Sequence, residues 1–307
     1  MASIRSHIIR YISAQYMKRV TPYRDVTELR TGLETRTSLL PPARGVRIQP
    51  TDIEGIKCEW HVPLGCADAP VIFYLHGGAY VMGSPATHRR LVSHIARAAK
   101  MRAVLPDYRL APEHRFPAAL EDSLKVYRNL IDNGLDAQRI AIGGDSAGGN
   151  LAASTLLALR DAGQTLPQAC FLMSPWLDMT GEGESIRTRA GIDPWFRPEH
   201  LAPTAGKIFS DFDKRNPLVS PVFADVSNLP PVLVHVGDHE ILLSDSTRFV
   251  DNIHRAGGEV ELTVWPGMWH VFQFFVGQMP ESNRSIEHIA EFLRSRFEQQ
   301  TSQHQAA

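Results

Sequence analysis

The segment IAIGGDSAGGNLAAS (140–154) places a serine where it could act as a nucleophile. Ser146 lies within the pattern G-x-S-x-G, between an apolar run typical of a buried strand and a helical pattern through Leu151 and Leu159. Such a tight turn needs its glycines because neighbouring Cβ atoms would clash, and it leaves the hydroxyl exposed on strained backbone. The helix N-terminus adds positive potential. A phosphate-binding loop would need a following lysine, which this segment lacks.

Backbone donors for such a nucleophile are predicted from a second glycine-rich segment, HGGAYVMGS (76–84), which follows an apolar run. The segment fits the HGGG-type motif, whose backbone N–H groups bind an oxyanion as it develops. We expect the oxyanion hole to consist of the N–H groups of Gly77, Gly78 and Ala147. The last of these directly follows the nucleophilic serine.

The general base is predicted from position in the chain. Among thirteen histidines, His270 lies in WPGMWHVF (265–272), a Pro/Gly loop between the last strand pattern and the C-terminal helix pattern. Hydrolases that use G-x-S-x-G place their triad in the chain order serine, acid, histidine, and His270 fits the third place. We assign His76 and His114 to structural hydrogen bonds.

The acid of the triad is predicted from HVGDHEILLSDS (235–246), which contains three carboxylates. Asp245 follows a plausible N-cap, Ser244, and there it would favour the helix dipole. Asp238 and Glu240 are two residues apart in extended chain, so periodicity does not separate them, although aspartate is the commoner triad acid. The two histidines of the segment keep zinc binding as an alternative. Our prediction is that the protein uses no metal and no cofactor.

The elements that would position these residues form an α/β pattern. Eight runs are predicted to be strands: VRIQ, GIKCEWHV, VIFYL, RAVLP, IAIG, ACFLM, PVLVHV and VELTVW. Helical patterns lie between them, which implies right-handed βαβ units and a mostly parallel eight-stranded sheet with helices on both faces. The serine, the acidic segment and His270 all follow strands, at the edge where open α/β sheets place their sites.

Two segments fall outside this alternation. Residues 174–230 contain no clear strand, and such long connections are usually lids or binding elements. We expect an insertion at 180–215 and the N-terminal residues 1–45 to form a helical cap, with residues 46–307 as the catalytic domain. Aromatic residues of the connection are candidates to line a substrate pocket, or alternatively part of the cap's own core: Trp176, Trp195 and Phe212.

The first twenty residues contain arginine and lysine but no acid, which would also suit a mitochondrial presequence. We favour an amphipathic helix that docks on the body through a face containing Ile4, Ile8, Ile12 and Tyr16.

Composition excludes several other classes of function. The chain has 307 residues, of which 43% are hydrophobic and 21% charged, and its formal net charge is −1, so nothing favours a nucleic-acid partner. No apolar stretch reaches the length of a membrane span. Three cysteines form no CxxC pair, which favours reduced thiols in a cytoplasmic protein.

Together, four segments resemble the hormone-sensitive-lipase-like carboxylesterases of the α/β-hydrolase fold: HGGAYVMGS, DYRLAPEHRFPAALED, GDSAGGNLA and WPGMWHVF. The resemblance covers most of the chain from about residue 70 onward. It implies an eight-stranded sheet, a helical cap, and hydrolysis of short- to medium-chain acyl esters without metal or cofactor. By the same analogy, the strand VELTVW and the C-terminal helix could form a homodimer face.

This sequence departs from the family pattern in two places. Ala79 stands where a third glycine is usual, and its N–H remains usable if φ there is negative. The acid-Pro-Leu-x-Asp pattern of many members is matched loosely, which leaves the identity of the acid open. The family register, with leucine two residues after the acid, favours Glu240 over Asp238.

The resemblance implies an acyl-enzyme mechanism with Ser146 as nucleophile, His270 as base and then acid, and Glu240 as the orienting carboxylate, with Asp238 as the alternative. Two other functions stay open at this point. The same triad could deacylate amides or arylamides. A non-catalytic small-molecule receptor of the same fold is less favoured because His270 is present.

Overall fold

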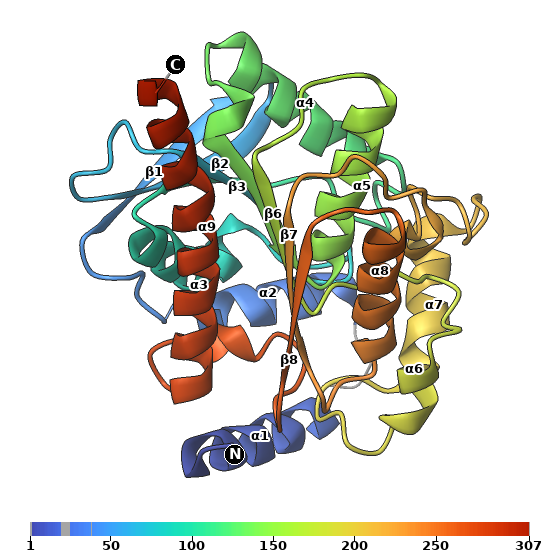
Figure 1. Ribbon diagram of the computed structural model, residues 1–307. Coiled ribbons are helices and arrows are strands. Elements are labelled where there is room, and N and C mark those ends of the chain that lie inside the picture. The colour runs from blue at the N-terminus through green and yellow to red at the C-terminus, as the bar shows by residue number, and fades with distance from the viewer. Residues whose placement is uncertain (1, 20–24, 38, 307) are drawn as a thin grey trace.

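The protein forms three layers, a central sheet between two layers of helices, in a computed structural model that describes residues 2–19, 25–37 and 39–306 (Figure 1). Eight strands of the described chain form one sheet: β1 (Val46–Ile53), β2 (Ile56–Pro63), β3 (Val71–Leu75), β4 (Arg102–Pro106), β5 (Ile140–Asp145), β6 (Ala169–Met173), β7 (Val232–Gly237) and β8 (Val260–Trp265). Each contains or overlaps, to within one residue, one of the predicted runs.

The strand order is β1-β2-β4-β3-β5-β6-β7-β8. The β1–β2 and β2–β4 pairs are antiparallel, and all later neighbours are parallel. This confirms the predicted α/β-hydrolase class. Because β3, β5, β6 and β7 are parallel neighbours, the loops after these strands meet at one edge, where the candidate residues lie.

Helices cover both faces of the sheet. On one face, α3 (Pro85–Ala99) and α9 (Pro280–Ala306) pack side by side, and the other face carries α4 (Ala118–Asp132), α5 (Ala147–Asp161) and α8 (Leu243–Arg255) (Figure 1). The strand β3 shows why its run is apolar throughout. Phe73 and Leu75 join the core on the α5 side and Ile72 and Tyr74 join the core on the α3 side, so none of the four is exposed.

The remaining helices belong to the N-terminal residues and to the long connection after β6. They are α1 (Ile4–Arg19), α2 (Val26–Thr37), α6 (Glu184–Thr188) and α7 (Pro198–Phe209), with short 3₁₀ turns η1 (Ala137–Arg139), η2 (Pro221–Phe223) and η3 (Phe272–Phe275) elsewhere. Figure 1 shows α1 beside the end at which β8 finishes and α6 below α8. These helices therefore lie near the carboxyl edge of the sheet.

The N-terminal helix forms as predicted, but it docks through a different face. Ile4, Ile8 and Ile12 are 80%, 54% and 61% exposed, and the side chain of Tyr16 lies outside the described residues. The opposite side is covered instead, because Ser6 and Ser13 are 1% and 9% exposed and Ile9 packs against the cluster that contains Trp269. Just before the helix, the N–H and hydroxyl of Ser3 donate to Glu281 at 2.6 and 3.0 Å. The prediction that the face with Ile4, Ile8 and Ile12 docks on the body was therefore wrong.

Candidate active site

The loop between β5 and α5 holds Ser146 in the strained turn that its sequence pattern predicts. Its backbone has φ +54° and ψ −120°, and its N–H donates to Met173 O at 2.9 Å. A Cβ on Gly144 would lie 2.4 Å from Gly148 O, and one on Gly148 would lie 2.1 Å from Leu75 O. Both glycines are therefore required by close backbone approach. Ser146 is 8% exposed, and among the described residues its hydroxyl forms no hydrogen bond.

His270 faces a buried carboxylate. Its Nδ1 lies 2.9 Å from Glu240 Oε2, and the two residues are 2% and 0% exposed. The other oxygen, Oε1, accepts hydrogen bonds from the Gly237 N–H at 2.6 Å and the Ser174 hydroxyl at 2.8 Å. A carboxylate held in this way favours the His270 tautomer with its proton on Nδ1, which leaves Nε2 able to accept a proton.

Asp238 has a different role in the fold. Its Oδ1 accepts a hydrogen bond from the Gly267 N–H at 2.6 Å, and its side chain is 34% exposed. It links the loop after β7 to the loop after β8 and makes no contact with His270. Of the two carboxylates that periodicity left open, the structure therefore brings Glu240 to the histidine.

Asp245 lies in the first turn of α8, as expected, but the N-cap of that helix is Leu242 rather than Ser244, and Asp245 is fully buried. It accepts the N–H groups of Leu177 and Asp178 at 2.9 and 3.0 Å, so it fixes the loop after β6 onto α8. Burial raises the pKa of its carboxyl well above the usual range.

Ser174 was missed by sequence reasoning, although it directly follows β6 at the carboxyl edge. Its hydroxyl donates to Glu240 Oε1 and accepts the Val271 N–H at 3.1 Å. One hydroxyl therefore joins the acid to the loop that carries His270. Its φ of +47° shows that the backbone there is also strained. The available signal was its place at a strand end, since a lone serine has no characteristic spacing.

The loop after β3 bonds one of the three predicted oxyanion donors within the protein. The Gly77 N–H already donates to Asp145 Oδ1 at 3.0 Å, so it is occupied within the protein. The N–H groups of Gly78 and Ala79 have no acceptor among the described residues, and Ala147, as the first residue of α5, has no intrahelical acceptor. These three N–H groups, rather than that of Gly77, are the ones left free.

The backbone of this loop explains the shift by one residue. Ala79 has φ +54° and not the negative value required by the sequence argument, because the Val81 and Met82 N–H groups both donate to Gly78 O and close a left-handed turn. Gly78 itself has φ +119°, and a Cβ there would lie 2.1 Å from Met82 O. Only glycine fits at that position.

A buried polar network supports the loop from behind. Asp145 accepts hydrogen bonds from the Tyr74 hydroxyl at 2.7 Å as well as from Gly77, and His88 Nε2 lies 3.3 Å from its carboxylate. Burial alone would raise the pKa of Asp145, but His88 and Tyr74 hold it below its usual value. Burial lowers the pKa of His76 to about 3, and its ring stacks on another aromatic ring, in keeping with a structural role.

Arg30 of α2 ties the N-terminal segment to the same loop. Its guanidinium donates to Val81 O at 2.7 Å and to Ala111 O at 2.8 Å, and it pairs with both oxygens of Glu113. Charge-assisted bonds of this kind are stronger than neutral ones. The arginine was not selected from the sequence, where nothing distinguishes it from other surface arginines.

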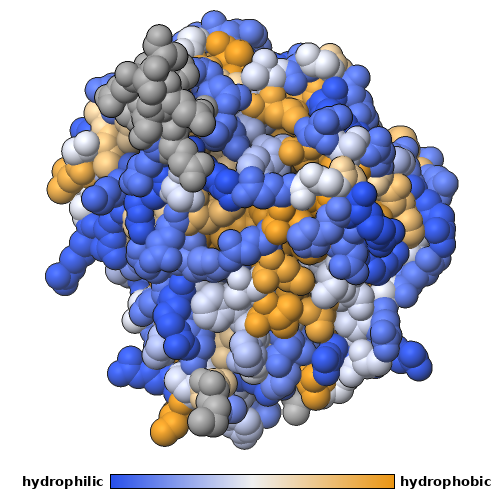
Figure 2. Space-filling model, in the orientation of Figure 1, coloured by the Kyte–Doolittle hydropathy of each residue, from blue (hydrophilic) through white to orange (hydrophobic). Residues whose placement is uncertain are grey.

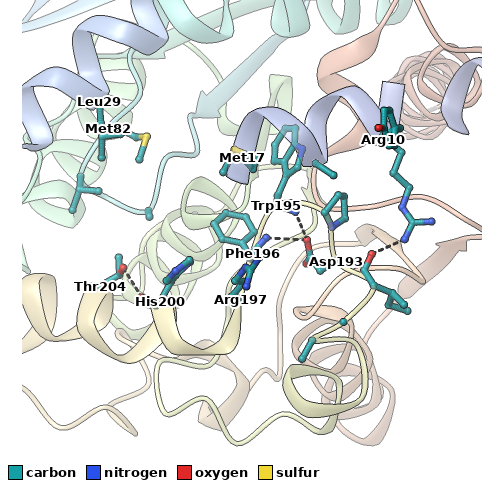
Figure 3. A pocket seen from close by; sticks show the side chains of 18 of the residues that line it. Arg10, Met17, Leu29, Met82, Asp193, Trp195, Phe196, Arg197, His200 and Thr204 are labelled. Carbon is teal, nitrogen blue, oxygen red and sulfur yellow. Dashed lines mark hydrogen bonds between the residues drawn. The ribbon is translucent and has the colours of Figure 1, made fainter. Parts of the chain in front are cut away.

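A cavity of about 730 Å³ adjoins these residues. It lies between α1, α2, the loop after β3 and residues 190–207, with Ala79 among its lining residues (Figure 3). Phe196 and Trp195 form the wall nearest the histidine, with ring centroids 4.6 and 6.4 Å from that of His270. The cavity is therefore placed to receive one side of a substrate bound at Ser146.

Of the three aromatic residues proposed for a pocket, only Trp195 lines this cavity. Trp176 is only 3% exposed and lies within the core. Its backbone N–H donates to Ser146 O, which fixes its backbone beneath the turn. Phe212 is 38% exposed and packs its ring against Phe116 instead.

The cavity wall is anchored by Asp193, which sequence reasoning also missed. One carboxylate oxygen accepts the N–H groups of Trp195 and Phe196 at 2.8 and 3.0 Å, and the other accepts the Ile241 N–H at 2.9 Å. The residue next to Glu240 is thereby bonded to the loop that contacts His270. Burial raises the pKa of Asp193, and these bonds oppose that effect only in part.

No three His, Cys, Asp or Glu side chains in the described part of the chain are arranged to hold a metal ion. His235 of the acidic segment, the main reason to consider zinc, bonds instead to Ser285 and His288. A helix long and apolar enough to cross a membrane is likewise not found among the described residues.

Comparison with known proteins agrees with this geometry. The family described as alpha/beta hydrolase fold matches residues 72–274. An esterase of Acinetobacter venetianus is 37% identical over 268 residues, which cover 87% of this chain and 88% of that protein. An acetyl-hydrolase of Streptomyces hygroscopicus is 40% identical over 77% of this chain and 79% of its own length.

Solved structures agree as well. The crystal structure of an esterase from the bacterial hormone-sensitive lipase family has a TM-score of 0.92 and 40% identity, with 97% of this chain and 99% of that chain covered. The chain therefore belongs to the α/β-hydrolase family, within its hormone-sensitive-lipase-like group, as the sequence motifs predicted.

Proposed function

We propose that Ser146, His270 and Glu240 are the catalytic triad of this carboxylic ester hydrolase. The observation that carries the assignment is the 2.9 Å contact between His270 Nδ1 and a Glu240 carboxylate that no solvent reaches. A buried carboxylate holds the imidazole in one tautomer and stabilises the imidazolium that forms when the serine is deprotonated. Asp238 accepts the Gly267 N–H instead, and we assign it no part in orienting His270.

The reaction proceeds through two displacements. Ser146 Oγ attacks the acyl carbonyl carbon while His270 Nε2 takes its proton, and the carbonyl oxygen becomes an oxyanion. His270 then returns the proton to the alcohol oxygen as the ester C–O bond breaks, which leaves an acyl-serine. Water attacks this acyl-enzyme by the same route, releasing the carboxylic acid and restoring the serine. We assign oxyanion binding to the N–H groups of Gly78, Ala79 and Ala147, each worth about 3–4 kcal/mol in comparable sites.

The substrates are short- to medium-chain acyl esters. The cavity beside His270 has apolar walls from Leu29, Met82 and Phe196 and a limited volume of about 730 Å³. Amides could use the same triad, and neither the cavity nor the triad distinguishes an ester oxygen from an amide nitrogen as the leaving group.

The test is a burst experiment with p-nitrophenyl butyrate. A catalytic serine releases p-nitrophenol in a burst whose amplitude matches the titrated active sites, followed by steady turnover. Binding without release of p-nitrophenol would instead identify a receptor. Parallel measurement with p-nitrobutyranilide gives the ratio of esterase to amidase activity.

We further propose that residues 1–45 and 180–215 act as a cap on a catalytic domain formed by residues 46–307. Contacts between the two cap segments support this, because Arg10 of α1 donates to Ile192 O at 2.6 Å. Both segments also line the cavity. Removal of the cap should therefore change KM and chain-length preference while the fold of the catalytic domain persists.

We also propose that β8 forms part of a homodimer face. It is the edge strand of the sheet, and Val264 on it is 38% exposed. Figure 2 shows apolar surface in the middle of the face where Figure 1 draws β8 between α9 and α8. Exposed apolar edges of this kind favour pairing with another chain. Light scattering at several concentrations, with Val264→Lys as the disrupting variant, tests the proposal.

A further inference from the structure

The cavity beside His270 is lined by more cationic than anionic side chains. Its lining includes cationic side chains from α1 and α7, namely Arg10, Arg197 and Lys207, together with His7 and His200. The one acid among the lining residues is Asp193. The chain as a whole has a formal net charge of −1, so this local excess of positive charge does not follow from composition.

Among the described residues, Asp193 forms no ion pair with these cations. Both of its oxygens already accept backbone N–H groups, from Trp195 and Phe196 on one side and from Ile241 on the other. It faces the loop rather than the open cavity, and Figure 3 shows it turned toward the backbone of Trp195 and Phe196.

The cations of α7 also lack partners of their own. In the described part of the chain, neither Arg197 nor Lys207 forms an ion pair with an acid, and both side chains are exposed. The guanidinium of Arg10 donates a hydrogen bond to Ile192 O at 2.6 Å. Because a backbone carbonyl is neutral, this bond does not offset the positive charge of Arg10. Charges of one sign in a cleft focus the field and attract ligands of the opposite sign.

Much of the remaining lining is apolar, and its aliphatic side chains lie apart from Arg197. Leu29 and Met82 lie on the side of α2 and the loop after β3, whereas Arg197 and His200 project from the start of α7 (Figure 3). A ligand that suits both parts has a short hydrocarbon portion and an anionic end. Because Phe196 contacts His270 and is followed by Arg197 in the chain, the anionic end would lie on the far side of Phe196 from the triad.

We propose that this enzyme prefers esters that carry a carboxylate, with Arg197 binding the carboxylate and Lys207, further along α7, adding to the positive field of the cavity, while the ester carbonyl lies at Ser146. The proposal rests on the proposed function, because it needs Ser146 to be the reacting group. The carboxylate could belong to the acyl part, as in a half-ester of a dicarboxylic acid, or to the alcohol part. Their shared chemistry is an ester with one carboxylate on a short chain.

The experiment compares pairs of esters in which a carboxylate is replaced by a neutral carboxamide of the same shape. Monoethyl adipate against ethyl adipamate tests the acyl side, and para-acetoxybenzoate against para-acetoxybenzamide tests the alcohol side. We expect kcat/KM at low salt to favour the carboxylate about tenfold in at least one pair, since one exposed charge contact together with the positive field of a second cation supplies about this much. The preference should fall when NaCl is raised from about 20 mM to about 500 mM, because salt screens exposed charges.

Variants locate the effect. Arg197→Gln with Lys207→Gln should lower kcat/KM for the preferred carboxylate ester about tenfold, and for its carboxamide partner by no more than about twofold. Arg255→Gln removes an exposed charge at the end of α8, outside the cavity lining, and should leave the carboxylate preference unchanged.

Three results would contradict the proposal. Equal rates on carboxylate and carboxamide esters by the wild-type protein would mean that the cavity does not select charge. A preference that survives in the double variant would mean that the carboxylate is bound elsewhere. Loss of both rates in the double variant would show that these residues support the fold or the triad instead. If the wild-type protein hydrolyses none of the four esters and gives no burst with p-nitrophenyl butyrate, the proposed function itself fails.

Discussion

The carboxyl edge of the sheet and the helices near it hold their residues by different means. At the edge, Ser146, Glu240 and His270 are each less than a tenth exposed, and hydrogen bonds join the loops that carry them. By contrast, α2 has no buried residue, and α1 exposes its isoleucines to solvent. The catalytic residues therefore depend on a preorganised hydrogen-bond network within the core. The helices α1 and α2, which line the cavity, are attached to the body mainly through a few polar bonds.

This difference predicts which substitutions should change kcat and which should change substrate preference. Changes at the edge should alter kcat by orders of magnitude, because they disturb groups that act on the transition state. Changes in the attached helices should alter substrate preference or leave activity as it was. One link between the two regions is Arg30, whose bonds join α2 to the loop after β3.

The largest expected effect is that of Ser146→Ala. Without its nucleophile the enzyme should lose about 10⁴-fold or more in kcat on p-nitrophenyl butyrate, while circular dichroism and Tm show a folded protein. Ordinary turnover by the purified variant would remove the basis of the whole mechanism.

The next effect separates the two carboxylates of the loop after β7. Glu240→Gln should lose roughly 10³–10⁴ in kcat because it no longer holds the required tautomer of His270. Asp238→Asn is the matched control and should lose far less, since a half-exposed carboxylate that bonds one backbone N–H contributes only about 1 kcal/mol. Side-by-side kinetics in which Asp238→Asn is the slower enzyme would transfer the role to Asp238.

Arg30→Gln tests the link between the regions. The change removes charge-assisted bonds to Val81 O, Ala111 O and Glu113, so the loop that carries Gly78 and Ala79 becomes less fixed. We expect kcat to fall about tenfold with little change in KM, since oxyanion binding acts on the transition state. Arg128→Gln, on the exposed side of α4, serves as the control. A change in KM alone would mean that Arg30 shapes the cavity and not the oxyanion loop.

Chain length tests the limited size of the cavity. From acetate to octanoate esters, kcat/KM should rise by up to about fourfold for each added CH₂, which corresponds to ~0.8 kcal/mol of apolar burial, and then level off or fall. The measurement is a p-nitrophenyl ester series with matched leaving group. A rate that still climbs through dodecanoate and palmitate esters would indicate a long open groove instead of a cavity of limited size.

The smallest effect is expected on the outer face of α1. Ile8→Ser replaces a side chain that is 54% exposed, so Tm should change by about 1 °C at most and kcat/KM should stay within about twofold. A large loss of stability in differential scanning calorimetry would show that this face is covered in solution.

Much of the fold and part of the site could be predicted from the sequence because they depend on local order along the chain. Continuous apolar runs such as VIFYL can be buried only between two layers of helices, so the eight strands and their class followed from pattern alone. The steric need for glycine on both sides of Ser146 is likewise local. The place of His270 followed from chain order, which the topology of the sheet preserves.

Only the tertiary structure decided between groups that are equivalent along the chain. Asp238 and Glu240 have the same period, and what separates them is which one reaches His270 from a neighbouring loop. Gly77 and Gly78 are adjacent glycines, yet Asp145 from the next strand occupies one N–H and leaves the other free. The roles of Ser174 and Asp193 depend on partners that are 66 and 48 residues away in the chain. The face on which α1 docks likewise depends on a distant segment, the cluster that contains Trp269. Which carboxylate, N–H group or helix face is used is decided by contacts between distant segments. The interaction energies of these contacts exist only once the chain has folded.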